Sequence, residues 1–337
     1  MEKHEVFIGV DVSKSKLDVS VVIGNNEKAL YHQVYANNKG GIRSMFSDLK
    51  KRSGTKNPAW LFCLEHTGVY AMPFLYGLSE KKLDHALVPA IVIQRSMGLK
   101  RGKSDKADSL DIARYACLHQ LQIEQFHLPD DTLVKLKLLL SHRERLVNAR
   151  VTFQNASKET GAFLDASVVK ELVKESKSVI VLLNKKIKKM DERIEELVRS
   201  NDALYEPYKL ATSVPGIGPQ IAYHLLVHTH CFKDFSNSRK LACYMGIAPF
   251  EYTSGSSIRG RTRVSHWANK KLKALMSMGA LSAVRFDSEL KNYYERKLAE
   301  GKHKTLVLNA VKNKLTARVM ATVKRGTPYV PIMKYAA

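Results

Sequence analysis

The sequence predicts an α/β domain at the N-terminus, a helical spacer and a mostly helical C-terminal domain. Strand-like runs crowd the first 36 residues, helix-like and strand-like stretches then alternate to about residue 120, and later apolar residues recur at helical spacing. Strands followed by alternating helix and strand are typical of a mixed sheet covered by helices. We therefore expect three parts, residues 1–125, 126–205 and 206–330, in a chain long enough for more than one core.

The elements of the first part follow from local patterns. Three β-branched and aromatic runs, VFIGVDV, LDVSVVI and ALYHQVY, are separated by Ser-Lys-Ser and Gly-Asn-Asn turns and predict three strands. The succession that follows predicts a mixed sheet with helices on its faces. The spacing of apolar residues predicts helices over 39–52, 70–82 and 104–120, a helix that starts near 92, and strands over 59–65 and 85–89.

The spacer predicts two long helices. The stretches LVKLKLLLSHRERLVNAR and VIVLLNKKIKKMDERIEELVRS place apolar residues at helical spacing with charged residues between them. We expect an antiparallel, coiled pair joined near Gly161, which offers a surface for self-association. Most of the charges on this pair are interpreted as a solvated face.

The C-terminal domain opens with a turn rich in glycine and proline. The tract SVPGIGP precedes the apolar helix QIAYHLLVH, a pattern typical of helix-hairpin-helix motifs. The backbone N–H groups of such a turn, here at Gly216 and Gly218, can bind a phosphate. A tight turn without a ligand explains the pattern equally well.

A tract rich in hydroxyl groups and arginine runs from residue 253 to 263. Its composition predicts a flexible loop, and a helix begins at residue 270. Cations can hold a phosphate while a hydroxyl attacks it, so the tract suits phosphodiester chemistry, with a solvated surface loop as the alternative. The candidate nucleic-acid contacts are Arg259, Arg261, Arg263, Lys270 and Lys271.

The charge balance indicates an anionic partner. The chain has 55 basic and 32 acidic residues, a formal net charge of +23, and its last 137 residues carry +14 of that excess. Such a field favours binding to nucleic acid. With no apolar leader, no run of about 18 apolar residues and no closely spaced cysteine pair, we expect a cytoplasmic protein without membrane contact, zinc site or disulfide framework.

Four acidic residues mark a candidate metal site. Asp11 follows the apolar run VFIGV and Glu65 follows WLFCL, so both carboxylates are expected at an edge of the sheet. Asp105 and Asp108 open a helix-like stretch and, being three apart, share one helix face. Carboxylates are hard oxygen ligands, and such a set can hold Mg²⁺ for phosphodiester chemistry.

These motifs, in this order, resemble a known family. The stretches IGVDVSKSKLDV, CLEHTGVY, KSDKADSLDIARYA, SVPGIGP and GIAPFEYTSGSSIRGRTRV follow one another through nearly the whole chain. The succession resembles the DEDD transposases of the insertion-sequence family IS-one-ten, relatives of the Piv invertase. The resemblance rests on the order of the motifs, because none of them is sufficient alone.

The resemblance implies a RuvC-like N-terminal domain of ribonuclease H fold, in which Asp11, Glu65, Asp105 and Asp108 bind Mg²⁺. It implies a C-terminal transposase domain with a catalytic serine, matched here by Ser254, that forms a covalent phosphoserine link with DNA. It also implies donor and target DNA as substrates, a non-coding bridge RNA, and a homo-oligomer, dimer or tetramer, with sites shared between subunits.

Several neighbouring residues receive no role. His266 and Trp267 stand where family members often have lysine and arginine, so no function is assigned to them. Asp18 is left outside the acidic set, and Asp111 is interpreted as a surface charge of its helix. Composition leaves open which hydroxyl of residues 253–257 attacks, and the family tract favours Ser254.

Other functions stay open at this point. A metal-dependent hydrolytic nuclease or Holliday-junction resolvase of the same fold would not need the serine tract. A sugar-kinase-like ATPase would have a glycine-rich phosphate loop and little net charge, and neither is present. A DNA-binding protein without activity would not need four acidic residues at these positions.

Overall fold

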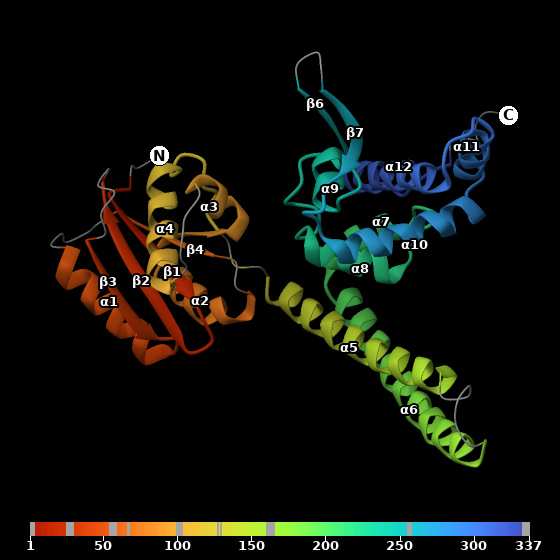
Figure 1. The fold of residues 1–337 in the computed structure, drawn as a ribbon, viewed down its shortest axis with the longest axis horizontal. Coiled ribbons are helices and arrows are strands. Elements are labelled where there is room, and N and C mark those ends of the chain that lie inside the picture. The colour runs from red at the N-terminus through yellow and green to blue at the C-terminus, as the bar shows by residue number, and fades with distance from the viewer. Residues whose placement is uncertain are drawn as a thin grey trace. The chain divides into compact units, whose positions relative to one another are not determined.

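The computed structural model describes residues 4–24, 30–53, 59–65, 68–98, 104–126, 128, 130–159, 166–254 and 258–331. The chain divides into two compact units, residues 1–128 and 129–337 (Figure 1). Among the helices in these described ranges, none is long and apolar enough to cross a membrane.

The first unit is built on a five-stranded mixed sheet with the strand order β3-β2-β1-β4-β5. Strand β2 is antiparallel to β1 and β3, whereas β4 and β5 continue the sheet parallel to β1. This is the RuvC-like, ribonuclease H-like topology, so the predicted fold class is confirmed. The strands are β1 (Val6–Val12), β2 (Lys16–Ile23), β3 (Tyr31–Ala36), β4 (Trp60–Glu65) and β5 (Asp84–Val88).

Helices cover both faces of this sheet (Figure 1). Alternate residues of β1 point to opposite faces, so Ile8 packs in one core cluster and Phe7 in the other. The first cluster includes side chains of α1 and α2, and the second includes side chains of α3 and α4. These elements are α1 (Lys39–Ser53), η1 (Gly68–Ala71), α2 (Met72–Glu80), α3 (Ala90–Ser96) and α4 (Asp105–Leu118).

Helix α4 lies against β1 at a glycine. A Cβ atom added at Gly9 would lie 2.1 Å from the carbonyl oxygen of Ser109 and 2.3 Å from the backbone nitrogen of Ala113. The backbones of strand and helix therefore touch where any other residue would hold them apart. A buried hydrogen bond of 2.8 Å between the hydroxyls of Ser20 and Ser109 also joins α4 to β2.

The second unit begins with the long helices α5 (Asp131–Glu159) and α6 (Ala166–Arg199), which pack along each other. Arg143 Nε donates to Asp191 Oδ1 at 2.5 Å, and Arg150 donates to the Asn184 side chain at 3.1 Å. The sequence number falls along α6 as it rises along α5, so the pair is antiparallel, as predicted. Position 161 lies outside the described residues.

The remaining helices enclose the core of this unit. Leu136 and Leu140 of α5 and Ile194 of α6 belong to the same buried cluster as residues of α8, α10 and α12, so the near ends of the long helices are part of that core. The helices are α7 (Asp202–Thr212), α8 (Pro219–His228), α9 (Ser238–Tyr244), α10 (Lys270–Phe286), α11 (Ser288–Ala299) and α12 (Lys304–Arg325).

The prediction of a flexible loop between residues 253 and 263 was wrong for its described part. Strands β6 (Pro249–Ser254) and β7 (Ile258–Val264) form an antiparallel hairpin with an irregularity between Phe250 and Tyr252. Composition pointed to a loop because Ser, Gly and Arg dominate. The interspersed aromatic and β-branched residues Tyr252, Thr262 and Val264 favour strand pairing instead. Residues 255–257 lie outside the described residues.

Candidate active site

Two of the four predicted acidic residues lie at the carboxyl ends of two neighbouring inner strands, which form one edge of the sheet. The parallel strands β1 and β4 pair Val10 with Leu64, so Asp11 and Glu65 are the next residues on neighbouring strands. Both side chains are partly buried. The carboxyl ends of these two strands therefore bring the two carboxylates to the same edge, as the sequence predicted.

The other two acidic residues approach from helix α4. Asp105 and Asp108 occupy its first turn, which Ser104 caps by accepting a hydrogen bond from the Ala107 backbone N–H at 3.2 Å. Because α4 touches β1 at Gly9, its first turn is held near the end of that strand.

The pKa of Asp11 also reflects the nearby carboxylates. Burial, followed by the negative charges of Asp105, Asp108, Glu65 and Asp18, raises the pKa of Asp11 to about 6. A carboxylate whose charge is opposed by several neighbours is a place where a cation is favourable.

Two residues that the sequence analysis left out belong to this cluster. Asp18 lies directly opposite Asp11 in the β1–β2 pair and is only 4% exposed. Lys16 Nζ donates to Asp105 Oδ2 at 2.5 Å and lies 3.1 Å from Asp18 Oδ2. His32 Nε2 lies 3.2 Å from the other carboxylate oxygen of Asp18. Lys16 is therefore a tethered cation between two of the carboxylates.

A sequence signal for Asp18 existed. The short turn after β1 pairs Val12 with Leu17, and continuing that register by one residue places Asp11 opposite Asp18. Paired residues of antiparallel strands share a face of the sheet. No local signal indicates the bond from Lys16 to Asp105, because those residues are 89 positions apart.

The donor chemistry of the cluster fits a divalent cation, but its carboxylates would have to rearrange to coordinate one. Among the residues described by the structure, no three His, Cys, Asp or Glu side chains are grouped to bind a metal ion. One reason is visible at Asp105, whose Oδ2 is occupied by Lys16. Hard carboxylate oxygens are the ligands that Mg²⁺ prefers, so Asp105 would have to exchange Lys16 for the metal.

Asp111 lies three residues beyond Asp108 on helix α4. Its Oδ1 lies 3.8 Å from Arg114 on the same helix. This i,i+3 pair matches its interpretation as a charge of the helix surface.

The hairpin of the second unit carries the predicted serine and arginines. Ser254 is the last residue of β6 and pairs with Ile258, while Arg259, Arg261 and Arg263 belong to β7. The hairpin backbone therefore places the predicted nucleophile position and the arginine positions on two adjacent strands. The side chain of Arg263 is exposed.

The turn before α8 has a partly structural explanation. Gly216 has φ +92°, and a Cβ there would lie 2.6 Å from the Gly279 carbonyl oxygen and 2.7 Å from Ala283 Cβ on α10. Glycine is thus required at 216 by backbone conformation and by packing. Gly218, the N-cap of α8, has open space where a Cβ would stand. Unlike Gly216, Gly218 is not required by close packing.

The two predicted lysines of α10 differ in environment. Lys271 Nζ donates to Glu144 Oε1 of α5 at 2.6 Å, so it connects two helices of the unit. Lys270 is exposed. The Asn269 side chain caps α10 by accepting a hydrogen bond from the Leu272 backbone N–H at 3.0 Å.

Two family profiles of transposases match this chain. Residues 8–160 match the profile of the DEDD transposases of the IS110 type, described as "Transposase", and residues 208–295 match "Transposase IS116/IS110/IS902 family". The pilin gene-inverting protein of Moraxella bovis is 23% identical over 334 residues, covering 96% of this chain and 98% of that protein. An IS110 protein of 43.6 kDa from Streptomyces coelicolor is 33% identical over 131 residues, covering 38% of this chain and 32% of that protein.

A solved structure, T. thermophilus RuvC in complex with a Holliday junction substrate, aligns with a TM-score of 0.29 and 14% identity. It covers 36% of this chain and all of the RuvC chain. The sheet topology and the two transposase profiles define an enzyme that acts on DNA. The chain carries IS110-type transposase domains over residues 8–160 and 208–295.

Proposed function

We propose that the protein is the transposase of an insertion sequence and exchanges DNA strands through a covalent Ser254–DNA intermediate. The observation that carries this proposal is the convergence of Asp11, Glu65, Asp105 and Asp108 on one sheet edge, in a chain whose second unit presents a serine–arginine hairpin. A hydrolytic nuclease of the same fold would use the acidic edge alone.

The covalent step balances without a further reactant. The Ser254 hydroxyl oxygen forms a bond to phosphorus as the bond from phosphorus to a deoxyribose oxygen breaks. The serine proton passes to a base, and the released strand oxygen takes up a proton to become a hydroxyl. One phosphodiester replaces another, so a strand hydroxyl can reverse the step at the serine and join new ends without ATP.

Mg²⁺ is the proposed cofactor, with the four carboxylates as its holders. A bound Mg²⁺ would polarise the phosphate and stabilise negative charge on the leaving oxygen. The arginines of the hairpin, Arg259, Arg261 and Arg263, would hold the phosphodiester against the serine hydroxyl. The backbone N–H groups near Gly218 would bind a flanking phosphate.

A bridge RNA and a homo-oligomer complete the proposal. The net charge of +23 attracts polyanions and is compatible with binding both DNA and RNA. Base pairing between such an RNA and the donor and target DNA would supply sequence specificity, as in other guided systems. The α5–α6 pair offers the extended helical surface on which subunits of a dimer or tetramer could associate.

The proposal is tested by trapping the intermediate. Purified protein is mixed with end-labelled duplex DNA, Mg²⁺ and RNA transcribed from the sequence that flanks the gene, and the products are separated on a denaturing gel. We expect a labelled protein–DNA adduct that is lost in Ser254→Ala, because only the serine oxygen would bond to phosphorus. Thr253→Val, a matched removal of the adjacent hydroxyl, should retain the adduct. Cleaved DNA with no adduct would identify a hydrolytic nuclease instead.

The Lys16 contacts predict an effect on metal binding. Lys16→Met should bind Mg²⁺ about tenfold more tightly, since a positive charge no longer competes with the ion for Asp105. The same change should lower the unfolding temperature in EDTA, because Asp18 and Asp105 lose their shared cation. Calorimetric titration and thermal unfolding measure the two effects.

Lys14→Met is the matched control for this experiment, because Lys14 is exposed in the same turn and carries the same charge. Equal Mg²⁺ affinity in the two variants would show that Lys16 is an ordinary surface cation.

A further inference from the structure

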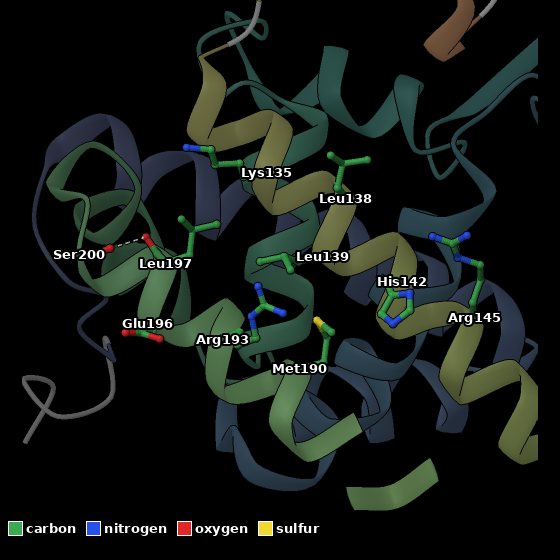
Figure 2. Close-up of a pocket in the computed structure, with 10 residues that line it drawn as sticks. All are labelled: Lys135, Leu138, Leu139, His142, Arg145, Met190, Arg193, Glu196, Leu197 and Ser200. Carbon is green, nitrogen blue, oxygen red and sulfur yellow. Dashed lines mark hydrogen bonds between the residues drawn. The ribbon is translucent and has the colours of Figure 1, made fainter. Parts of the chain in front are cut away.

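A groove runs between helices α5 and α6 in the second unit (Figure 2). It has a volume of about 710 Å³, and a smaller hollow of about 240 Å³ shares His142, Met190 and Arg193 with it. Leucines and Met190 form much of the lining, and Leu138 is 58% exposed. The cationic or titratable basic side chains around the two hollows are Lys135, His142, Arg145, Lys186, Lys189 and Arg193.

Most cations of this groove have no anionic partner within the described ranges. No ion pair or hydrogen bond joins the Lys135, Arg145 or Arg193 side chains to another described residue, and the same holds for Lys186 and Lys189. The only acidic side chain that lines either hollow is that of Glu196.

Other arginines of the same two helices behave differently. Arg143 is bound to Asp191, and Arg199 to Glu195. Among the described residues, Lys135, Arg145 and Arg193 therefore keep unpaired positive charges beside the largely apolar lining of the groove.

The spacing of these cations suits a charged polymer. Lys135 and Arg145 are ten residues apart on α5, a rise of about 15 Å. One strand of B-form DNA carries a phosphate for each 3.4 Å or so of helix axis, so the groove spans about four phosphates. Lys186 and Arg193 face the same groove from α6 and offer charge along its other side.

We propose that this groove binds the sugar–phosphate backbone of one strand of duplex DNA. Lys135, Arg145 and Arg193 contact phosphate oxygens, and Leu138 packs against deoxyribose carbons. The groove is a site separate from the hairpin at Ser254, so it adds affinity and positions the duplex without taking part in bond breakage. The inference rests on the DNA-acting class of the enzyme and is independent of the serine chemistry proposed above.

The test compares two triple variants of the full chain, each lacking three positive charges. The groove variant is Lys135→Gln, Arg145→Gln, Arg193→Gln. The control variant is Lys174→Gln, Lys185→Gln, Lys188→Gln, three exposed lysines of α6 outside both hollows. Affinity for a fluorescent duplex DNA is measured over a series of salt concentrations, and thermal unfolding checks that both variants fold.

The groove variant should bind duplex DNA at least about tenfold more weakly, and its salt slope should fall by about 2.7, since each lost phosphate contact removes about 0.9. The control should stay near the unmodified protein on both measures. Equal losses of DNA affinity in the two variants would overturn the proposal, because DNA binding would then depend on overall positive charge and not on the groove. If the groove variant loses affinity only for duplex RNA of the same sequence, the groove binds RNA and the proposal is wrong. If it loses affinity for neither probe, the groove does not bind nucleic acid, and a protein becomes the candidate partner.

The trapping experiment separates this inference from the serine proposal. At saturating DNA, the groove variant should still form the covalent adduct, because its hairpin and acidic edge are intact. Loss of the adduct at saturating DNA, with folding retained, would place the groove in the chemical step and contradict its assignment as a binding site alone.

Discussion

Asp105→Asn and Glu65→Gln are each expected to reduce Mg²⁺-dependent strand cleavage by about 10²–10³-fold or more. Each change removes one carboxylate from the edge where β1, β4 and the first turn of α4 meet. Charge stabilisation by a bound metal is worth several kcal/mol, and about 1.4 kcal/mol corresponds to a tenfold change in rate. Single-turnover cleavage of labelled duplex DNA at several Mg²⁺ concentrations measures the loss.

The fold should survive these substitutions. Asparagine and glutamine keep the size of the side chains they replace and remove like charges that oppose one another around Asp11. Metal-free thermal stability should therefore be unchanged or higher in Glu65→Gln.

Asp111→Asn is the matched control, since it removes a carboxylate from the same helix at a position that pairs with Arg114. Cleavage by that variant should stay within about twofold of the unmodified protein, because the removed carboxylate is outside the four proposed metal ligands and its i,i+3 pair is weak. Retained cleavage in Asp105→Asn, or equal losses in all three variants, would contradict the assignment of the acidic edge as the metal site.

Gly9→Ala is expected to destabilise the first unit by about 3 kcal/mol or more and to abolish cleavage. The added Cβ would lie 2.1 Å from the Ser109 carbonyl oxygen and 2.3 Å from the Ala113 nitrogen, both backbone atoms of α4 that cannot rotate away. Helix α4 must move from the sheet, and its first turn with Asp105 and Asp108 moves with it. Thermal unfolding and strand cleavage measure the two effects.

Gly77→Ala is the control for backbone crowding. Its Cβ would have ordinary contact, 3.8 Å to Ile42 Cγ2, and the residue lies inside α2. Alanine favours a helix over glycine by up to about 1 kcal/mol, so this variant should be as stable as the unmodified protein or slightly more stable. A Gly9→Ala protein with unchanged stability and activity would show that α4 is not held by that contact.

Much of the first unit was predictable because its signals are local. The β-branched and aromatic runs VFIGVDV and LDVSVVI identified two strands, and an acidic residue at the end of each of two apolar runs identified Asp11 and Glu65. The three-residue spacing of Asp105 and Asp108 placed them together on a helix. These properties depend on short stretches of chain whose backbone geometry is set by neighbouring residues.

The hairpin of the second unit shows where composition misleads. Serine, glycine and arginine favour loops, yet β6 and β7 pair along most of their length. Strand propensity depends on a partner strand, which composition does not include.

The sequence by itself determined the mixed sheet, the two long helices and the four acidic positions, because β-branched runs, helical periodicity and carboxylate placement are properties of short stretches of chain. Only the tertiary structure decided which distant groups meet. It placed Lys16 between Asp18 and Asp105 and packed α4 onto Gly9. It also brought Lys135 and Arg145 of α5 to the same groove as Arg193 of α6. Contacts of this kind arise from the packing of whole elements, so Lys16 can donate to Asp105, 89 positions away, although nothing in either local stretch indicates it.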